Sequence, residues 1–305
     1  MIIKVPDAYE GKRVSTLLQK ENGVSNKLLQ HLKYKAHGIT KNGEDVRAND
    51  VLGAGDVLTL DLSEAPKDNL LSSGKKPQIL YESETVVVLN KPAQTPTHPS
   101  GSHRTDSAAN MLAAYYGSRF TFHPVGRLDA DTTGVLLAAK DPYTAAQLQS
   151  GRKEGKVRKI YVALTTEAPE KEEGILRSYL KISDDGLKVL VSETEKEGYK
   201  EARTAYRVLN ASENGAVIAA RTLTGRTHQI RAQFAAVGCP LIGDILYGSK
   251  DRRLPRHALH AYRMIFPQDG QEVRVLAPLP DDFSAIMQQI GIGKKIDLDD
   301  FPEFC

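Results

Sequence analysis

Apolar residues near the N-terminus recur three and four positions apart, which is the spacing of one face of a helix. This spacing predicts two helices, one over Val14–Leu18 and one over Leu28–Leu32, with Ser25 as the N-cap of the second. Two short apolar runs follow, at Val51-Leu52 and Val57–Leu60, and predict strands. Residues 1–65 are therefore expected to form a small separate unit of helices and strands.

Longer apolar runs begin near residue 79 and predict a second, larger unit over residues 79–290. Runs of this kind are typical of strands that are buried in a sheet. They occupy residues 79–81, 86–90, 135–139, 159–164, 205–209 and 216–221. Residues 107–116 instead favour a helix, and Asp141-Pro142 marks the start of another. Strands and helices in both units indicate an α+β protein.

Three segments have the composition of connections rather than of a core. Residues 66–78 are rich in Pro, Ser, Gly and Lys, which is typical of a linker between domains. Residues 165–200 are polar with several glutamates, and we interpret them as a solvated excursion. Residues 291–305 carry aspartates and a glutamate, and we expect an acidic tail to which no function is assigned.

The composition narrows the class of protein without naming its function. The chain has 305 residues, 40% of them hydrophobic and 26% charged, which is ordinary for a globular protein. No apolar run is long enough to span a bilayer, and we expect no signal peptide. Cys239 and Cys305 are too few for a disulfide framework or a cysteine-rich metal site. We therefore expect a cytoplasmic protein. We also expect a monomer, and no stretch has the pattern of a coiled coil. A net charge of +3 does not by itself predict a nucleic-acid partner, so the placement of charge has to decide.

The most informative stretch is the polar loop over residues 123–134, directly before the apolar run at 135–139. Its plainest interpretation is a well-formed surface turn with solvated charges. The order Asp129-x-Asp131-x-Thr133 also fits phosphatases of the haloacid-dehalogenase type, in which the aspartate accepts a phosphoryl group beside magnesium. That pattern should follow a hydrophobic strand, yet Pro124 and Gly126 stand in that place.

The same loop resembles a longer motif of another enzyme family. Its sequence Arg127-Leu128-Asp129-x-x-Thr132-Thr133-Gly134 is similar to the R-L-D-x-x-T-[ST]-G loop of RluA-type RNA pseudouridine synthases. The stretch from Thr224 to Arg231 matches that family's T-G-R-x-H-Q-[IL]-R, and the match continues to Gly248. Lys91-Pro92 and the strand from Lys159 to Ala163 match two further family motifs. These blocks in family order argue against the phosphatase. The family usually has histidine before the arginine, where this chain has Gly126.

The resemblance implies a fold and an activity. It implies a mixed, largely antiparallel sheet with flanking helices, and an enzyme that isomerises uridine within RNA without a cofactor or a metal ion. The RNA expected is that of the large ribosomal subunit. Transfer RNA is an alternative substrate, and a non-catalytic RNA-binding factor of ribosome assembly is an alternative function.

The resemblance also assigns roles to single residues. Asp129 would be the catalytic carboxylate, with Tyr161 and Arg231 as the other catalytic residues. A free aspartate has a pKa of about 3.9, and burial would raise that value unless a cation such as Arg231 lies nearby. Arg127 would stack in the space vacated by the displaced uracil. The other RNA-binding residues expected in this part of the chain are Lys91, Arg226 and His228.

The N-terminal unit resembles the alpha-L RNA-binding domain, which many RNA-modifying enzymes share. The similarity is carried by residues 24–29, by Asn42-Gly43 and by Gly55-Asp56. Lys27 and Lys33 belong to a basic stretch that the resemblance implies would bind RNA. The alternative is a small α/β domain whose lysines are merely solvated.

Overall fold

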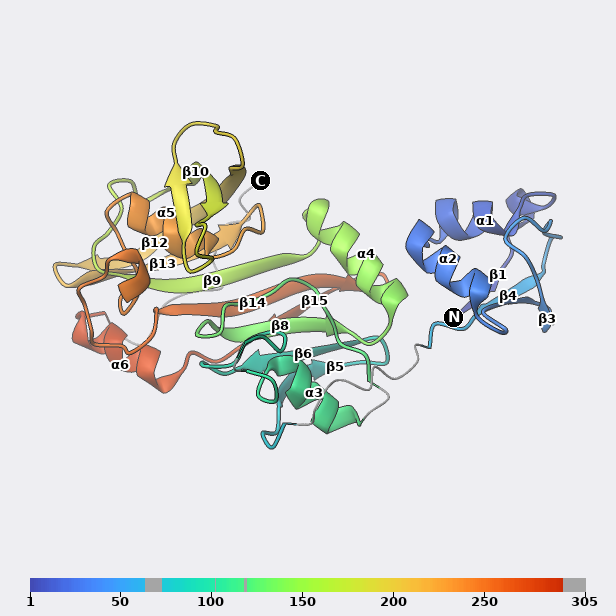
Figure 1. Cartoon of the computed structure of the whole chain (residues 1–305), viewed down its shortest axis with the longest axis horizontal. Helices are drawn as coiled ribbons and strands as arrows, with labels where there is room; N and C mark the ends of the chain where they lie inside the picture. The colour runs from blue at the N-terminus through green and yellow to red at the C-terminus, as the bar shows by residue number, and fades with distance from the viewer. Residues whose placement is uncertain (64–72, 102, 118–119, 293–305) are drawn as a thin grey trace.

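A computed structural model describes residues 1–63, 73–101, 103–117 and 120–292 of the chain. Within these residues the strands form two separate sheets, one of four strands and one of eleven (Figure 1). Most of the linker predicted at 66–78 and most of the acidic tail predicted at 291–305 lie outside the described residues. The two sheets have separate hydrophobic cores.

The N-terminal unit packs short helices on the small sheet. The sheet runs in the order β1 (Ile2–Lys4), β4 (Val57–Leu60), β2 (Ile39–Lys41) and β3 (Glu44–Asp45). The helical segments are η1 (Asp7–Tyr9), α1 (Val14–Thr16), the π-helical turn η2 (Leu17–Glu21) and α2 (Asn26–Tyr34). The Ser25 hydroxyl accepts a hydrogen bond from the Leu28 N–H at 3.2 Å, which confirms the predicted cap of α2.

One strand predicted in this unit is absent. Val51 makes a single bridge to Arg13, and Val51-Leu52 is not part of a strand. The backbone of Leu52 is instead hydrogen-bonded to Gly11 and Lys12 in the preceding loop. A run of two apolar residues is too short to decide between a strand and a buried loop, because either conformation satisfies its backbone groups.

The large sheet extends along most of the remaining chain. Its order is β11 (Val189–Ser192), β10 (Glu173–Ile182), β12 (Lys200–Ser212), β13 (Gly215–Thr222), β9 (Arg158–Thr165), β14 (Leu259–Gln268), β8 (Thr133–Ala139), β6 (Val86–Lys91) and β5 (Gln78–Glu82). In addition, β15 (Gln271–Leu276) pairs with β14 and β7 (His123–Pro124) with β8. Among the described strands, β8 and β14 form the one parallel pair, and the other pairings are antiparallel. The sheet is therefore mixed.

Five helical segments flank this sheet. They are α3 (Ala108–Tyr116), α4 (Pro142–Lys153), α5 (Gln229–Ala236), η3 (Ile245–Tyr247) and α6 (Asp281–Gln289). Asp141 caps α4 by accepting the Thr144 N–H at 2.8 Å, and Pro142 occupies its first turn, as predicted. The last described residue, Ile292, is buried in the same cluster as Phe283 of α6. No helix among the described residues has the length and apolar character that crossing a membrane requires.

The parallel contact between β8 and β14 fixes the end of the polar loop. All residues of β8 are buried, and the register pairs Gly134 with Ala261. A β-carbon on Gly134, whose φ is +105°, would lie 2.1 Å from the Ala261 carbonyl oxygen, so only glycine permits this approach. The C-terminal end of the loop over residues 127–132 is therefore held at a defined position, next to the start of β14.

The interpretation of residues 165–200 as a solvated excursion is wrong in part. Much of this stretch forms β10 and β11, which continue the sheet beyond β12. Gln233 of α5 holds the hairpin, because its side-chain amide donates to the carbonyl of Leu176 and to the hydroxyl of Ser178. The exposed side chains gave the stretch its polar pattern, although its backbone is paired.

Candidate active site

Asp129 lies in the loop between β7 and β8, and the loop is fixed on both sides of this residue. The Thr132 N–H donates to the Asp129 carbonyl at 3.1 Å and closes a turn. The hydroxyl of Thr97 bonds both backbone groups of Leu128, accepting from its N–H at 3.0 Å and donating to its carbonyl at 2.9 Å. The Asp129 side chain is 25% exposed, so it is held near solvent by a rigid support.

The buried side chain of Lys91 holds the same loop in place. This structural role differs from the RNA-binding role that was expected for Lys91. Its side chain is fully buried and donates to the carbonyls of Pro92, Thr95 and Ala130 at 2.9, 2.6 and 2.7 Å. An ammonium with three protein acceptors at these distances has no donor left for a phosphate. Burial lowers the pKa of Lys91 to about 7, and the carboxylates of Asp131 and Asp129 oppose the shift.

Arg231 approaches Asp129 from α5. Its Nη1 lies 3.2 Å from Asp129 Oδ2, while Nε and Nη2 bind the two carboxylate oxygens of Asp244 at 2.7 and 2.9 Å. Asp244 is 1% exposed, and this bidentate pair fixes the plane of the guanidinium. Burial lowers the pKa of Arg231, but the bonds and charge of Asp244, aided by Asp129, outweigh it, and the net shift is upward. A permanent positive charge is therefore aimed at Asp129.

His228 approaches the same oxygen of the Asp129 carboxylate as Arg231 does. Its Nε2 lies 3.9 Å from Asp129 Oδ2, and its Nδ1 lies 3.0 Å from the Tyr247 hydroxyl. That hydroxyl accepts the Val189 N–H at 2.8 Å, so its own proton is free to bond His228 Nδ1 and leave the ring proton on Nε2. His228 has a φ of +50°, in the left-handed region, which non-glycine residues adopt rarely and often at functional sites.

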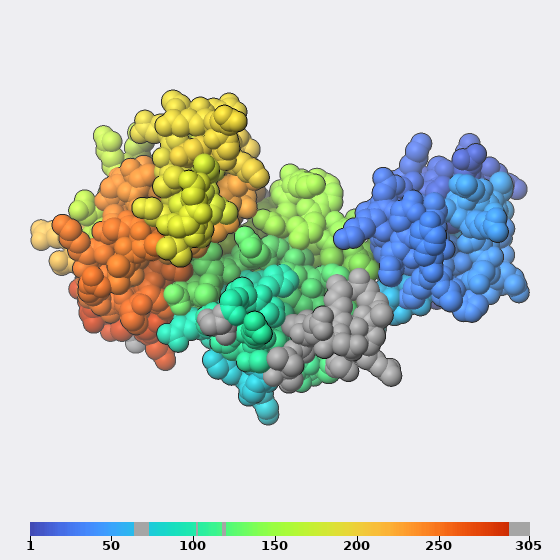
Figure 2. Space-filling view, in the orientation of Figure 1, coloured from blue at the N-terminus to red at the C-terminus, as the bar shows by residue number. Residues whose placement is uncertain are grey.

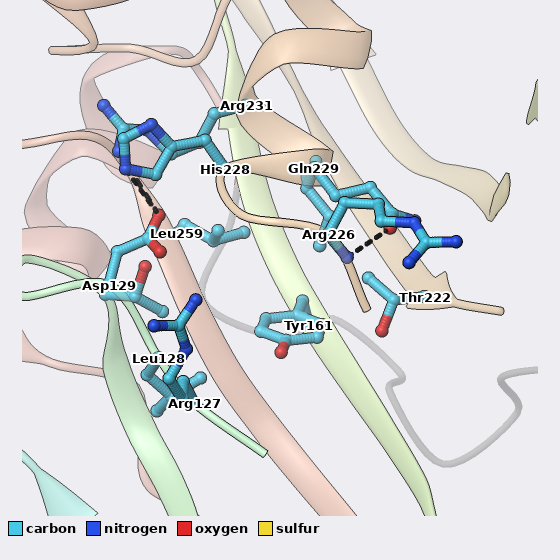
Figure 3. A pocket seen from close by; sticks show the side chains of 12 residues that line it. Arg127, Leu128, Asp129, Tyr161, Thr222, Arg226, His228, Gln229, Arg231 and Leu259 are labelled. Atoms are coloured by element: carbon cyan, nitrogen blue, oxygen red, sulfur yellow. Dashed lines mark hydrogen bonds and ion pairs between the residues drawn. The ribbon is translucent and has the colours of Figure 1, made fainter. Parts of the chain in front are cut away.

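Tyr161 lines the cavity in front of Asp129 from strand β9. It is 8% exposed, and burial together with the charge of Asp129 raises the pKa of its hydroxyl. The hydroxyl therefore stays protonated at neutral pH, and the ring presents an apolar surface to the cavity. Figure 3 shows Arg127, Asp129 and Tyr161 around this space, with Arg231 and His228 behind the carboxylate.

The cavity is large and strongly basic. It has a volume of about 960 Å³ and extends from Asp129 past Tyr161 toward α4. The cations that line it are Arg127, Arg152, Lys153, Lys159 and Arg226, and Asp129 is the one carboxylate among its described lining residues. Burial and the charge of Arg152 lower the pKa of Lys159 to about 7. A polyanion fits this lining, because clustered cations are the electrostatic signature of nucleic-acid contact.

The structure therefore brings together most of the residues that the sequence singled out for the large unit. Arg127 is exposed and donates to the Thr227 hydroxyl at 3.3 Å, across the cavity. Arg226 binds the Glu201 carbonyl at 3.0 Å through Nε. Lys27 and Lys33 lie on α2 in the N-terminal unit, exposed and apart from the cavity.

For several residues of the site, the sequence did not predict the role that the structure shows. Asp244 and Tyr247 belong to a stretch that matched the family motif, but their sequence gave no indication that they fix Arg231 and His228. His257 bonds the Thr132 hydroxyl at 2.9 Å, whereas in the sequence it is one member of a basic patch with Arg252, Arg253 and Arg256.

The site does not have the form that a phosphatase would need. Asp129 precedes β8 rather than following a buried strand, and the Asp131 side chain accepts the Gln94 N–H at 3.2 Å. Within the residues that the structure describes, no group of three or more His, Cys, Asp and Glu side chains could hold a metal ion.

Comparison with known proteins places this site in a family. The model of the family described as RNA pseudouridylate synthase matches residues 85–236, which include Asp129, Tyr161 and Arg231. An "Uncharacterized RNA pseudouridine synthase YjbO" of Bacillus subtilis (strain 168) is 34% identical over 274 residues, covering 88% of this chain and 96% of the relative. The chain belongs to the RNA pseudouridine synthase family.

Two further relatives extend this result. "Ribosomal large subunit pseudouridine synthase D" of Pseudomonas aeruginosa is 29% identical over 273 residues, covering 80% of this chain and 81% of that protein. The solved structure of "Human RNA Pseudouridylate Synthase Domain Containing 4" superimposes with a TM-score of 0.58 at 26% identity, covering 70% of this chain and 93% of that one. This pseudouridine synthase therefore has the mixed-sheet fold of its family.

Proposed function

We propose that this pseudouridine synthase isomerises one or more uridines in large-subunit ribosomal RNA, with Asp129 as the catalytic carboxylate. The observation that carries the proposal is the pairing of Asp129 with Arg231 at the edge of a cavity whose other charged lining residues are cations. The guanidinium orients the carboxylate, and the surrounding cations favour a polyanionic substrate.

The reaction breaks the bond between N1 of uracil and C1′ of ribose and forms a bond between C5 and C1′. The proton lost from C5 is balanced by a proton gained at N1, so the product is an isomer and no redox partner is needed. Asp129 would attack the ribose or the base while the glycosidic bond is broken. Tyr161 would hold the detached uracil against its ring, and Arg231 would keep the carboxylate oriented.

Uracil must leave its stack before it can enter the cavity, at a cost of a few kcal/mol. Arg127 is placed to fill the vacated space, because it is exposed on the loop that carries Asp129. Its bond to the Thr227 hydroxyl is 3.3 Å long, so little is lost when the side chain turns toward RNA. Arg226 and His228 would contact the nucleotide from the opposite wall.

Two observations support ribosomal RNA as the substrate class. One is the similarity to proteins named ribosomal large subunit pseudouridine synthase D from Pseudomonas aeruginosa and Nitrosomonas europaea. The other is the N-terminal unit, in which exposed Lys27 and Lys33 lie on a capped helix. We propose that this unit is an alpha-L-type domain that binds structured RNA, with residues 66–78 as its linker to the catalytic domain.

The catalytic role of Asp129 is tested by the isosteric Asp129→Asn variant. We expect pseudouridine formation in a single turnover to fall at least about a thousandfold, because an amide cannot act as the nucleophile. RNA binding should remain, since the cations of the cavity are unchanged. Asp131→Asn is the matched control and should retain most of the activity, because an amide oxygen can still accept the Gln94 N–H. Full turnover by Asp129→Asn would refute the mechanism.

The substrate is tested separately with unmodified transcripts of large-subunit ribosomal RNA and of transfer RNA. Chemical mapping of pseudouridine after incubation with the wild-type protein should show one or a few modified positions in the ribosomal transcript. Modification confined to transfer RNA would assign the enzyme to that substrate instead.

A further inference from the structure

Arg152, at the end of α4, sits between the two loops that carry the catalytic motifs. Its Nη1 lies 3.2 Å from the position that a β-carbon on Gly126 would take, and its Nη2 lies 2.7 Å from the corresponding position on Gly225. Gly126 directly precedes Arg127, and Gly225 directly precedes Arg226. The guanidinium therefore occupies the space that side chains at these two positions would fill.

The two glycines differ in what they require. Gly126 has a φ of +90°, which an L-residue adopts only with strain, so its backbone alone favours glycine. Gly225 does not have a φ in that region, and the guanidinium is what lies against it. The chain has no side chain at position 126, and a cation from α4 lies in that place.

Among the residues that the structure describes, Arg152 has no partner that would explain its position. Its side chain is exposed, and no carboxylate or hydrogen-bond acceptor among the described residues binds its guanidinium. Its charge lowers the pKa of Lys159 and acts on Tyr161, so it lies within electrostatic reach of the catalytic side of the cavity. An unpaired guanidinium offers a planar set of donors that matches two oxygens of a phosphate.

Its neighbours make this wall of the cavity suited to a polynucleotide backbone. Lys153 follows it directly and lines the same cavity. Gln149, one turn earlier, donates to the Pro124 carbonyl at 3.2 Å and so ties α4 to the Arg127 loop. Arg152 is thus presented by a rigid helix rather than by a mobile loop.

We propose that Arg152 forms a phosphate-binding site, which holds the RNA backbone next to the nucleotide that enters the cavity. This site rests on the proposed function, since it positions the substrate of the same reaction. The phosphodiester is bound between the loop that contains Gly126 and the loop that contains Gly225. This contact holds the RNA strand in place on both sides of Arg127. Arg152 is therefore a positioning residue that does not act on the reacting atoms.

The test compares Arg152→Ala, Arg152→Lys and the control Arg274→Ala, an exposed arginine on β15 that does not line the cavity. Turnover is measured on the ribosomal transcript. Binding is measured in the Asp129→Asn background on both transcripts over a range of salt concentrations. For Arg152→Ala we expect KM to rise about tenfold with kcat little changed. The slope of log Kd against log salt should fall by about 0.7 to 0.9, the loss of one phosphate contact.

The controls distinguish a failure of the Arg152 phosphate site from a failure of the proposed function. Arg152→Lys should keep the wild-type salt slope because it keeps the charge, and Arg274→Ala should match the wild type. A wild-type KM and salt slope in Arg152→Ala would overturn the phosphate site, as would a fall in kcat alone. A wild-type enzyme that leaves the ribosomal transcript unmodified would overturn the substrate instead, while the salt slope still decides on Arg152.

Discussion

At the scale of single residues, Lys91 shows how a buried charged side chain can hold the conformation of the Asp129 loop. Its ammonium binds three carbonyls, and one of them belongs to Ala130, the residue after Asp129. Burying an ammonium is costly, and burial lowers the pKa of Lys91 to about 7. The carbonyl bonds offset that cost only while the loop keeps its conformation, so the lysine and the loop stabilise each other.

Replacing Lys91 with methionine should therefore impair catalysis rather than binding. We expect kcat to fall roughly a hundredfold, because a small displacement of a reacting group has effects of this size. KM and the salt dependence of RNA binding should stay close to those of the wild type. Both are measured by steady-state kinetics on the ribosomal transcript, with thermal unfolding as a check that the variant folds.

The contrasting variant is Lys153→Met, at an exposed lysine that lines the cavity. It should raise KM and reduce the salt slope while kcat stays the same. If Lys91→Met gave this second pattern, Lys91 would contact RNA after all and the buried role would be wrong.

The sequence predicted the residues of the site better than it predicted their partners. Asp129, Tyr161 and Arg231 could be proposed because each lies in a motif whose letters resemble a family. Asp244 could not be assigned, because nothing local shows that its carboxylate turns back to a guanidinium thirteen residues earlier. For Lys91, the resemblance suggested RNA contact, but burial depends on the loop that folds over it. Partner choice is a property of tertiary structure.

At the scale of elements, β14 supports the Asp129 loop with two buried histidines at and before its start. His257 bonds the Thr132 hydroxyl at 2.9 Å, and His260 Nδ1 lies 2.7 Å from the Thr133 hydroxyl. Burial lowers the pKa of His257 well below its usual value and lowers the pKa of His260 to about 4. Both rings are therefore neutral in the folded protein at neutral pH.

This arrangement predicts a loss of stability in acid. Between pH 6.5 and 4 the unfolded chain protonates His260 and the folded protein does not, so stability falls as the pH falls. The shift of His260 to about 4 corresponds to a loss of about 3 kcal/mol at the acid end of this range. Urea unfolding at several pH values measures this loss.

His260→Asn isolates the contribution of this one ring, because carboxylates elsewhere titrate equally in both proteins. As the pH falls from 6.5 to 4, the free energy of unfolding of the wild type should decrease more than that of the variant. A difference that is independent of pH would show that His260 does not stay neutral in the fold.

The elements themselves were predictable where burial shaped the sequence. The strands β6, β8 and β9 are buried along nearly their whole length, so continuous apolar runs revealed them. Strand β10 is buried at only two of its ten positions and carries charges at Glu173, Arg177 and Lys181, so it looked like a loop. It is a strand because β12 and β11 pair with it on either side, and no local pattern records that pairing.

At the scale of the whole molecule, α4, light green in Figure 2, lies between the N-terminal unit and the rest of the large unit, and its last turn lines the cavity. The sequence predicted two units, but it did not predict that they touch. The Tyr143 hydroxyl donates to the Asn22 carbonyl at 2.7 Å, and its ring packs against the core of the N-terminal unit. Gln147, one turn later, donates to the carbonyls of Asn22 and Gly23 at 3.1 and 3.2 Å. The far end of the same helix carries Arg152.

This contact should fix the distance between two RNA-binding surfaces. We proposed that the N-terminal unit binds structured RNA. Because this unit is docked on α4, its binding would hold the cavity close to one position of the same RNA and so raise the effective concentration of that position at the cavity. Tyr143→Ala combined with Gln147→Ala removes the contact and leaves the cavity-lining residues in place. We expect KM on the full ribosomal transcript to rise roughly tenfold, because the freed unit samples many orientations.

A short RNA fragment that contains only the modified uridine and its flanking nucleotides distinguishes loss of the contact between the units from damage to the cavity. On this fragment the double variant and the wild type should have equal KM and kcat, since the fragment does not reach the N-terminal unit. Tyr143→Phe, which keeps the packed ring and loses one hydrogen bond, should fall between the two on the full transcript. Small-angle X-ray scattering should show a larger maximum dimension for the double variant. An unchanged KM on the full transcript despite that expansion would mean that the N-terminal unit binds RNA independently of its seat on α4.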